Sequence, residues 1–482
     1  MPIQPLPEEP SLQNLEKQIE QLQTRVRAGD AEALVQVREF HPRAEQALAG
    51  FELSDAQLVV ARGYGFPSWP KLKQHLEAVA RYIWRPPAAS ASPADEFLRL
   101  ACLDCHSWNL TWADQARQLL AEHPEIARAN LWTASAAGDA EAVRDFLARD
   151  PASVNAKGGP HHWEPLLYAC YSRVASTLEA ARVLLAAGAD PNAGFLWLGN
   201  IPPSTALTGA FGNGEGGANN PPHPDCEVLA RLLLDAGADP NDEQTLYNRH
   251  FGRDDTHFRI LLPYGLGRDK GGPWFRRLEQ LRPPAQLLVE ELWSAARKNY
   301  PERVTLLVEH GADVNGTGFR DGRTPYEAAV RAGHDAVAAY LLAHGARKVE
   351  LSDDERFAAA CISGRREEAL ALRDRCLPRL SFHQRLEMVH RAVEMNHPEG
   401  IRLMAELGFE VSGVTTHDGV GINLAATPLH NAAWMGNLEM VQLLLELGAD
   451  PTIRDPNYNG TPLDWAAYNR QEAVVEYLKR LH

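Results

Sequence analysis

The chain has 482 residues, of which 45% are hydrophobic and 23% charged, as in an ordinary soluble globular protein. Its 48 basic and 63 acidic residues give a formal charge of −15. These values argue against a disordered or fibrous chain, and the acidic balance argues against a nucleic-acid binder or a protein that spreads on anionic lipid. At about 150 residues per domain, length alone would allow about three domains.

The sequence also bears on location. No run of about 18 apolar residues is present, so we expect no membrane-spanning helix. The first ten residues are acidic and rich in proline, unlike a secretory signal. Six cysteines are too few for a disulfide framework. We therefore expect a cytoplasmic protein.

The first predicted unit is a helical module over residues 1–84. Apolar residues spaced alternately by three and four predict an amphipathic helix that packs against the next helix: Leu12, Leu15, Ile19, Leu22 and Val26. Residues 85–93 are rich in proline, alanine and serine, which predicts a linker between this module and the rest of the chain.

A cysteine motif follows the linker. Residues 102–106, Cys-Leu-Asp-Cys-His, match the C-x-x-C-H of covalent haem attachment. That chemistry resembles a c-type cytochrome, which matures outside the cytoplasm. The flanking apolar residues predict a buried helix face instead: Phe97, Leu98, Leu100, Ala101 and Leu103. We expect neither haem nor another cofactor.

Internal repeats dominate the remaining sequence. Gly-Ala-Asp recurs, each time after a leucine-rich run, at 188–190, 237–239, 311–313 and 448–450. The last two copies are separated by four periods of about 34 residues. Segments beginning Thr-Pro start further copies at Thr324, Thr427 and Thr461. Threonine followed by proline suits a helix start, and glycine ends a helix in a left-handed turn.

These motifs, above all Thr427-Pro-Leu-His-Asn-Ala-Ala433, resemble the ankyrin repeat. The resemblance covers residues 94–482 and implies an all-α fold, a solenoid of about ten stacked helix-turn-helix units. His430 is expected to link adjacent repeats. Residues 53–72 resemble a helical N-terminal module of bacterial ankyrin proteins and some glyoxalase-like proteins.

An insertion interrupts the repeats at residues 208–224. The interval from Gly188 to Gly237 is about 16 residues longer than one period. The extra segment is polar and rich in glycine, and we expect it to be flexible. Gly212, Gly214 and Gly217 satisfy G-x-G-x-x-G, but they follow a helical segment rather than a strand, which argues against a dinucleotide site.

Non-consensus residues around the insertion, over 161–257, predict a ligand-binding pocket. If equivalent positions of stacked repeats align, aromatic, acidic and basic side chains line one concave patch. The predicted ligand-binding residues are His161, His162, Trp163, Tyr168, Trp197, Phe211, Asn219, His223, Tyr247, Asn248, Arg249 and His250. The alternative is that these histidines cap helices or bridge repeats and the aromatic residues pack.

Catalysis and metal binding at this patch are weaker alternatives. Glu164, Glu215 and His223 are the candidates for general acid–base chemistry. The histidines show no compact ligand spacing such as H-E-x-x-H, so we expect no metal site. Residues 247–282 are locally basic, with a net charge of +4, which indicates a small anionic ligand or a solvated charged face.

The sequence thus predicts a binding scaffold that recognises a protein or peptide partner through its concave face, as the resemblance implies. We expect no nucleic-acid or membrane partner. The alternative is an enzyme or small-ligand receptor whose pocket is formed by residues 161–257.

Overall fold

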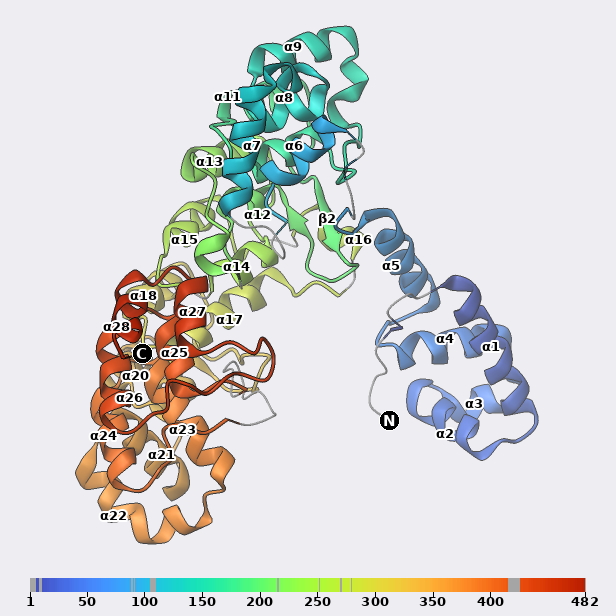
Figure 1. Cartoon of the computed structure of the whole chain (residues 1–482). Helices are drawn as coiled ribbons and strands as arrows, with labels where there is room; N and C mark the ends of the chain where they lie inside the picture. The colour runs from blue at the N-terminus through green and yellow to red at the C-terminus, as the bar shows by residue number, and fades with distance from the viewer. Residues whose placement is uncertain are drawn as a thin grey trace.

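The computed structural model describes residues 6–7, 11–87, 90, 92–104, 110–214, 216–250, 252–268, 271–278, 280–414 and 425–481. Helices make up most of this part, which confirms the predicted all-α solenoid. The stack runs from α9 at one tip to α22 at the other, and α1–α5 form a separate N-terminal group that meets the stack at α5 (Figure 1).

The N-terminal group has five helices: α1 (Leu12–Arg27), α2 (Ala31–Phe40), α3 (Ala44–Leu48), α4 (Leu53–Gly63) and α5 (Trp69–Tyr82). Ser11 begins α1 by accepting a hydrogen bond from the Asn14 amide (3.1 Å). Four of the five predicted seam residues of α1 are buried: Leu15, Ile19, Leu22 and Val26. They pack mainly against α4 and to a lesser extent against α2, the next helix in the chain.

A small sheet joins this group to the stack. The strands are β1 (Ile83–Trp84), β2 (Gly194–Trp197) and β3 (Ser204–Thr205); β1 is parallel to β2, and β2 is antiparallel to β3. Gln74 also donates a hydrogen bond to the Arg276 carbonyl in α16 (Pro273–Arg277) at 2.7 Å. The N-terminal helices are therefore held by side-chain and strand contacts as well as by the chain connection.

The solenoid consists of helix pairs whose first helices pack side by side, α8 on α10, α10 on α12, and α17 through α27 in turn. The described residues contain eleven pairs: α6 (Pro93–Ala101) with α7 (Leu110–Glu122), α8 (Leu131–Ala137) with α9 (Ala140–Arg149), α10 (Pro165–Tyr171) with α11 (Leu178–Ala186), α12 (Ala206–Phe211) with α13 (Cys226–Asp235), α14 (Glu243–Arg249) with α15 (Thr256–Leu261), α17 (Pro284–Arg297) with α18 (Pro301–Glu309), α19 (Pro325–Ala332) with α20 (Asp335–Ala343), α21 (Asp353–Ser363) with α22 (Arg366–Cys376), α23 (Phe382–Glu394) with α24 (Pro398–Glu406), α25 (Pro428–Trp434) with α26 (Leu438–Glu446), and α27 (Pro462–Tyr468) with α28 (Glu472–Lys479).

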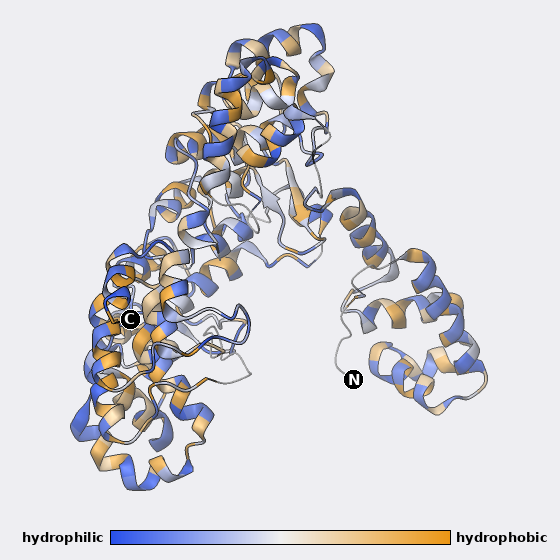
Figure 2. Ribbon diagram, viewed as in Figure 1, coloured by the Kyte–Doolittle hydropathy of each residue, from blue (hydrophilic) through white to orange (hydrophobic). Residues whose placement is uncertain are grey.

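Short 3₁₀ turns connect some of these helices: η1 (Pro124–Arg128), η2 (Pro151–Asn155), η3 (Gly217–Asn219), η4 (Leu262–Tyr264) and η5 (Leu377–Arg379). Hydrophobic and hydrophilic residues alternate around the helices, as expected where each helix buries one side against its neighbours (Figure 2). One apolar core extends from Trp84 to Ala346, and a second from Ala332 to Leu478.

The repeat motifs form the helix starts and links that the sequence predicts. Thr324, Thr427 and Thr461 each cap a first helix and form a capping box with the residue three positions later. His430 contacts Thr427 Oγ1 (2.7 Å) through Nδ1 and the carbonyl of Gly460 (3.0 Å) through Nε2. This imidazole therefore links two adjacent repeats, which confirms its predicted structural role.

The haem-like motif lies partly outside the described residues, because these do not include Cys105 and His106. Cys102 is buried, and its Sγ lies 3.8 Å from the Tyr168 carbonyl. All five apolar residues flanking the motif are buried: Phe97, Leu98, Leu100, Ala101 and Leu103. The prediction of a buried apolar face is confirmed.

The insertion at 208–224 differs from the expected flexible loop. Its first residues, through Phe211, belong to α12, and Asn219, Asn220 and His223 are buried. The buried guanidinium of Arg173 donates hydrogen bonds to the carbonyls of Gly209 (2.6 Å) and Pro221 (2.8 Å). A buried cation that bridges both ends of the insertion holds it against the stack, a contact that composition could not reveal.

The insertion also contacts the far end of the chain, and we call this the closing contact (residues 217–219 with 468–470). Asn219 Nδ2 donates a hydrogen bond to the Tyr468 carbonyl (2.7 Å), and the Ala218 amide donates to Asn469 Oδ1 (3.1 Å). An ion pair of 3.2 Å between Arg297 of α17 and Glu394 of α23 also joins distant repeats. The C-terminal repeats therefore curl back toward the middle of the stack.

Candidate functional site

A cavity of about 490 Å³ lies where the fifth helix pair meets the sixth. Its walls come from the loop between β2 and β3, from α14, from α17 and from the segment that follows α18. Its volume falls in the usual range for ligand pockets, about 300–1,000 Å³. Its aromatic, charged and amide-bearing lining residues include Trp197, Glu243, Tyr247, Asn248, His250, Arg282, Glu290, Glu291, Phe319 and Arg320.

Asp242 fixes the wall formed by α14. Its Oδ1 accepts a hydrogen bond from the Thr245 amide (3.0 Å), and its Oδ2 accepts bonds from the hydroxyls of Thr205 and Thr208. The carboxylate is buried, and burial raises its pKa. These bonds tie the start of α14 to β3 and α12, which sets where Tyr247 and Asn248 lie.

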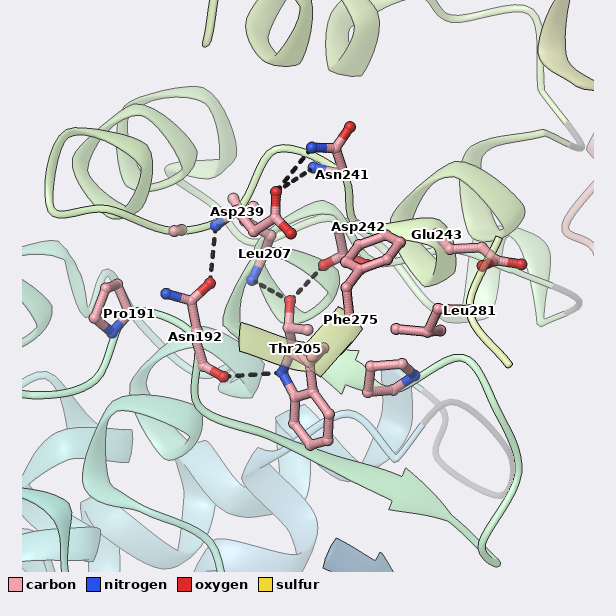
Figure 3. Close-up of a pocket in the computed structure, with 13 residues that line it drawn as sticks. Pro191, Asn192, Thr205, Leu207, Asp239, Asn241, Asp242, Glu243, Phe275 and Leu281 are labelled. Carbon is pink, nitrogen blue, oxygen red and sulfur yellow. Dashed lines mark hydrogen bonds between the residues drawn. The ribbon is translucent and has the colours of Figure 1, made fainter. Parts of the chain in front are cut away.

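A second, much smaller hollow adjoins this network (Figure 3). Its volume is about 20 Å³, room for about one water molecule. Asn192 crosses it by accepting a hydrogen bond from the Asp239 amide (2.9 Å) at Oδ1 and one from Trp274 Nε1 (3.0 Å) at its carbonyl. We treat this hollow as part of the packing and the larger cavity as the candidate site.

Two of the three carboxylates in the cavity are paired with arginines. Glu243 Oε1 lies 3.3 Å from Arg282 Nη1, and Glu290 Oε1 lies 3.4 Å from Arg320 Nε. Glu290 Oε2 also accepts a hydrogen bond from the Phe319 amide (3.0 Å). Burial raises the pKa of both carboxyls, although the adjacent arginines oppose the shift.

The third carboxylate, Glu291, faces a histidine instead. His250 Nδ1 lies 3.8 Å from Glu291 Oε2, and burial lowers the pKa of His250, which favours the neutral imidazole. Among the described residues, no lysine or arginine lies within ion-pair distance of Glu291, which is 5% exposed. The cavity therefore holds one buried acidic group without a cationic partner.

Comparison with known families shows what the repeats are. A family model described as "Ankyrin repeats" matches three times, at residues 290–352, 358–455 and 389–481. The C-terminal part of the chain, over residues 290–352 and 358–481, consists of ankyrin repeats. The matched copies begin at α17, so the cavity lies at the junction between the matched repeats and the non-consensus repeats before them.

Two curated relatives are similar to part of this chain. They are the proteins named Palmitoyltransferase ZDHHC13 from Homo sapiens and from Pongo abelii, each 29% identical over 207 residues. The alignments cover 41% of this chain and 32% of each relative. The chain thus spans about a third of the length of the curated relatives that it matches.

Within the described residues, no helix is long and apolar enough to cross a membrane. The same residues contain no group of three or more histidine, cysteine, aspartate or glutamate side chains placed to hold a metal ion.

The structure divides the predicted ligand-binding residues among several places. Trp197, Tyr247, Asn248 and His250 line the cavity together. Arg249, next to two of them, is not among the lining residues and pairs with Asp254 and with the side chain of Asn213. The sequence thus identified residues from two walls of the cavity, the one at β2 and the one at α14.

A second group lies in an aromatic core near β1 and β2. His161 stacks on Trp163 with ring centroids 4.4 Å apart, and Trp163 stacks on Phe195 at 4.7 Å. The Tyr168 hydroxyl donates a hydrogen bond to the Gly158 carbonyl (2.8 Å). Burial lowers the pKa of His161 to about 4. His162, beside it, is exposed.

The remaining predicted residues lie at contacts between helices. Phe211 is buried beside His257, and Asn219 belongs to the closing contact. His223 Nδ1 accepts a hydrogen bond from the Asp225 amide (3.0 Å), and Nε2 lies 2.8 Å from Thr177 Oγ1. For these residues and for the aromatic core, a part in ligand binding stays a prediction.

The three catalytic candidates have separate surroundings. Glu164 begins α10 and lies 3.7 Å from Lys157 Nζ, whereas His223 is bonded to Thr177 and Asp225. Burial raises the pKa of Glu164 and lowers that of His223 to about 3. Glu215 lies outside the described residues. A catalytic role for this set stays a prediction.

Sequence reasoning missed the acidic wall, Glu243, Glu290 and Glu291, and the aromatic Phe319. A signal was present, because Glu290 and Glu291 interrupt an apolar run (Leu287-Leu-Val-Glu-Glu-Leu-Trp293) in a first helix. Two adjacent charges in such a run place at least one on a buried face. From the basic stretch 247–282, Arg282 lines the cavity, whereas Arg253, Arg259, Arg268 and Arg276 are exposed.

Proposed function

We propose that this chain is a scaffold that binds a protein or peptide partner, with the cavity between α14 and α17 as its anchoring site. The observation that supports this most is the lining itself. Three aromatic side chains (Trp197, Tyr247 and Phe319) and a set of buried charged groups surround a space of about 490 Å³. Aromatic anchors in a pocket with a polar rim are typical of sites that carry most of a binding free energy.

Two of these aromatic residues are suited to a test because they are partly exposed. Tyr247 is 36% exposed and Phe319 is 52% exposed, so truncating them leaves the apolar cores intact. We would purify partners from cells of the source organism with the tagged full-length chain and with the double variant Tyr247→Ala, Phe319→Ala. Proteins that bind through the cavity should be retained by the unaltered chain and lost from the variant.

Tyr458→Ala supplies the control, because Tyr458 is 77% exposed and is not among the lining residues. It should retain the same partners as the unaltered chain. Equal recovery with the double variant and the unaltered chain would contradict the proposal.

An enzyme or small-ligand receptor in the same region is the second candidate, and one group of residues favours it. Ser294 Oγ lies 3.2 Å and Glu291 Oε2 lies 3.8 Å from the same atom, His250 Nδ1. Ser294 Oγ is also 3.3 Å from Nε2, so it lies almost equally far from both ring nitrogens. The residue is only 1% exposed. A buried hydroxyl in this position favours binding over nucleophilic catalysis.

A screen of metabolites by thermal shift separates these candidates. A small-ligand receptor should be stabilised by at least one metabolite, and Tyr247→Ala should abolish the shift. We also propose a cytoplasmic location. It is supported by five described cysteines that are free thiols, as is usual in a reducing compartment: Cys102, Cys170, Cys226, Cys361 and Cys376. We further propose that the chain divides into a helical module (1–84), a linker (85–93) and the repeat array (94–482).

A further inference from the structure

Asn248 Nδ2 and Glu291 Oε2 are among the buried polar atoms in the walls of the cavity that lack hydrogen-bond partners. Asn248 Nδ2 donates no hydrogen bond, although Oδ1 of the same amide accepts one from Gln244 Nε2 (2.8 Å). Glu291 Oε2 accepts none. Both residues are at least nine-tenths buried, with 4% and 5% of their surfaces exposed. A buried polar group without a partner has lost its bonds to water and gained none in return, so a ligand that satisfies both groups gains affinity.

The charges of the lining give the sign of that ligand. Glu243 is paired with Arg282, and Glu290 with Arg320. Glu291 is the one carboxylate of the described lining without an arginine at ion-pair distance, and its near neighbour is His250, 3.8 Å away, whose pKa is lowered by burial. The lining therefore has one negative charge in excess, and a cation is the ligand group that balances it.

We propose that the cavity takes a lysine or arginine side chain from an extended segment of a partner polypeptide. The ammonium or guanidinium group lies against Glu291, and a peptide carbonyl of the same segment accepts a hydrogen bond from Asn248 Nδ2. This inference rests on the proposed function, because it assumes that the ligand is a polypeptide.

The aromatic wall suits a cation as well. Arg282 already lies over the Phe319 ring, 3.7 Å from its centroid, so a guanidinium is accommodated in this part of the cavity. Trp197 and Tyr247 line the same space. A cation over an aromatic face is attracted by the electrons of the ring, and the attraction is stronger where water is excluded. The predicted small anion, by contrast, meets three carboxylates here.

Titration calorimetry with four blocked peptides tests the cation requirement. Their sequences are acetyl-Gly-X-Gly-Gly-amide, with lysine, arginine, norleucine or glutamate at X. The lysine or arginine peptide should bind the full-length chain at least about tenfold more tightly than the norleucine peptide, a difference of about 1.4 kcal/mol. Equal affinity for the lysine, arginine and norleucine peptides would overturn the inference, and this comparison needs no protein variant.

Glu291→Gln should abolish the preference for lysine over norleucine, and Asn248→Ala should weaken binding of the lysine and norleucine peptides by the same factor. Glu302→Gln is the matched control, because it removes one charge from an exposed position of α18. A preference that survives Glu291→Gln contradicts the role of that carboxylate. n-Butylamine carries the cation without a peptide, and affinity equal to that of the lysine peptide would rule out the polypeptide part.

The two proposals fail in different ways. If partner capture depends on Tyr247 and Phe319 but the peptides show no preference for a cation, the scaffold stands and the cation site falls. If the lysine peptide binds through Glu291 while partner capture is unaffected by the double variant, the cation site stands and the proposed anchoring of partners falls.

Discussion

Arg470 donates a hydrogen bond from Nε to Oδ1 of Asn219, at 3.2 Å, across 251 positions of the sequence. Asn219 also donates from Nδ2 to the Tyr468 carbonyl, so both ends of one amide are bonded to the turn between α27 and α28. In a straight stack of repeats, the fourth and eleventh helix pairs would not meet, because each unit contacts only its neighbours. This contact shows that the array curls enough to touch itself.

The first prediction concerns the energy of the closing contact. Asn219→Ala removes two side-chain hydrogen bonds and leaves Arg470 and the Tyr468 carbonyl without these partners, so the free energy of unfolding should fall by about 1–3 kcal/mol. Urea unfolding measures the change, and hydrogen exchange of residues 216–220 and 468–471 should become faster. Asn457→Ala, at an exposed position, should change neither.

The second prediction isolates the close approach of the two chain segments. Gly217 and Gly322 both have left-handed backbones, with φ of +55° and +68°. Any side chain there costs about 1–2 kcal/mol. A Cβ on Gly217 would also overlap Asn469 Oδ1, whereas one on Gly322 meets nothing within 4 Å. Gly217→Ala should therefore lower the melting temperature more than Gly322→Ala does. Equal losses in the two variants would mean that the two segments are not in contact.

The third prediction is a stability change at alkaline pH. Lys298, whose side chain is 10% exposed, lies 3.9 Å from Glu394, and burial lowers its pKa to about 8 from an ordinary 10.5. Between these values the unfolded chain binds the proton and the folded chain does not, so the free energy of unfolding rises with pH. Relative to Lys298→Met, the unaltered chain should gain about 2–3 kcal/mol from pH 8 to 10.5.

Urea unfolding at pH 7.5, 9 and 10.5 provides the measurement for Lys298. Lys73→Met, at an exposed lysine, gives the control. The difference in free energy of unfolding between this variant and the unaltered chain should stay constant over the same pH range. If the difference in free energy of unfolding between Lys298→Met and the unaltered chain is also independent of pH, Lys298 keeps an ordinary pKa in the folded protein.

The fourth prediction is a loss of stability in acid through His223. Burial lowers the pKa of His223 to about 3, and the Asp225 amide donates to Nδ1, which must stay unprotonated. The unfolded chain takes up the proton below about pH 6.5, so this part of the stability is lost as pH falls from 6.5 toward 3. His223→Gln can keep one donor and one acceptor without titrating. Its free energy of unfolding should therefore fall less steeply between pH 7 and 4.5.

For this test His344→Gln is the control, because His344 is exposed. The other buried histidines, such as His334 and His390, contribute equally to both chains and cancel in the difference. If the slopes of His223→Gln and the unaltered chain agree, the imidazole of His223 is accessible to protons in the folded state.

Part of the candidate site followed from sequence and part did not. Trp197, Tyr247, Asn248 and His250 stood out as departures from the repeat pattern, and they line the cavity. His161, Trp163 and Tyr168 departed from it in the same way but fill an aromatic core. A departure from consensus marks a residue with a special environment, and residue type alone does not tell whether that environment is a cavity or a core.

The sequence by itself determined the repeats. Thr-Pro starts, glycine ends and leucine runs specify each helix pair through local capping and an apolar face, so the all-α solenoid could be predicted from about 34 residues at a time. Only the tertiary structure decided the curl of the array, the packing of the insertion around Arg173, and the meeting of Glu243, Glu290 and Glu291 around one cavity. These features depend on small rotations that add up over many repeats and on contacts between residues up to 251 positions apart. A sequence pattern within one repeat carries no information about either.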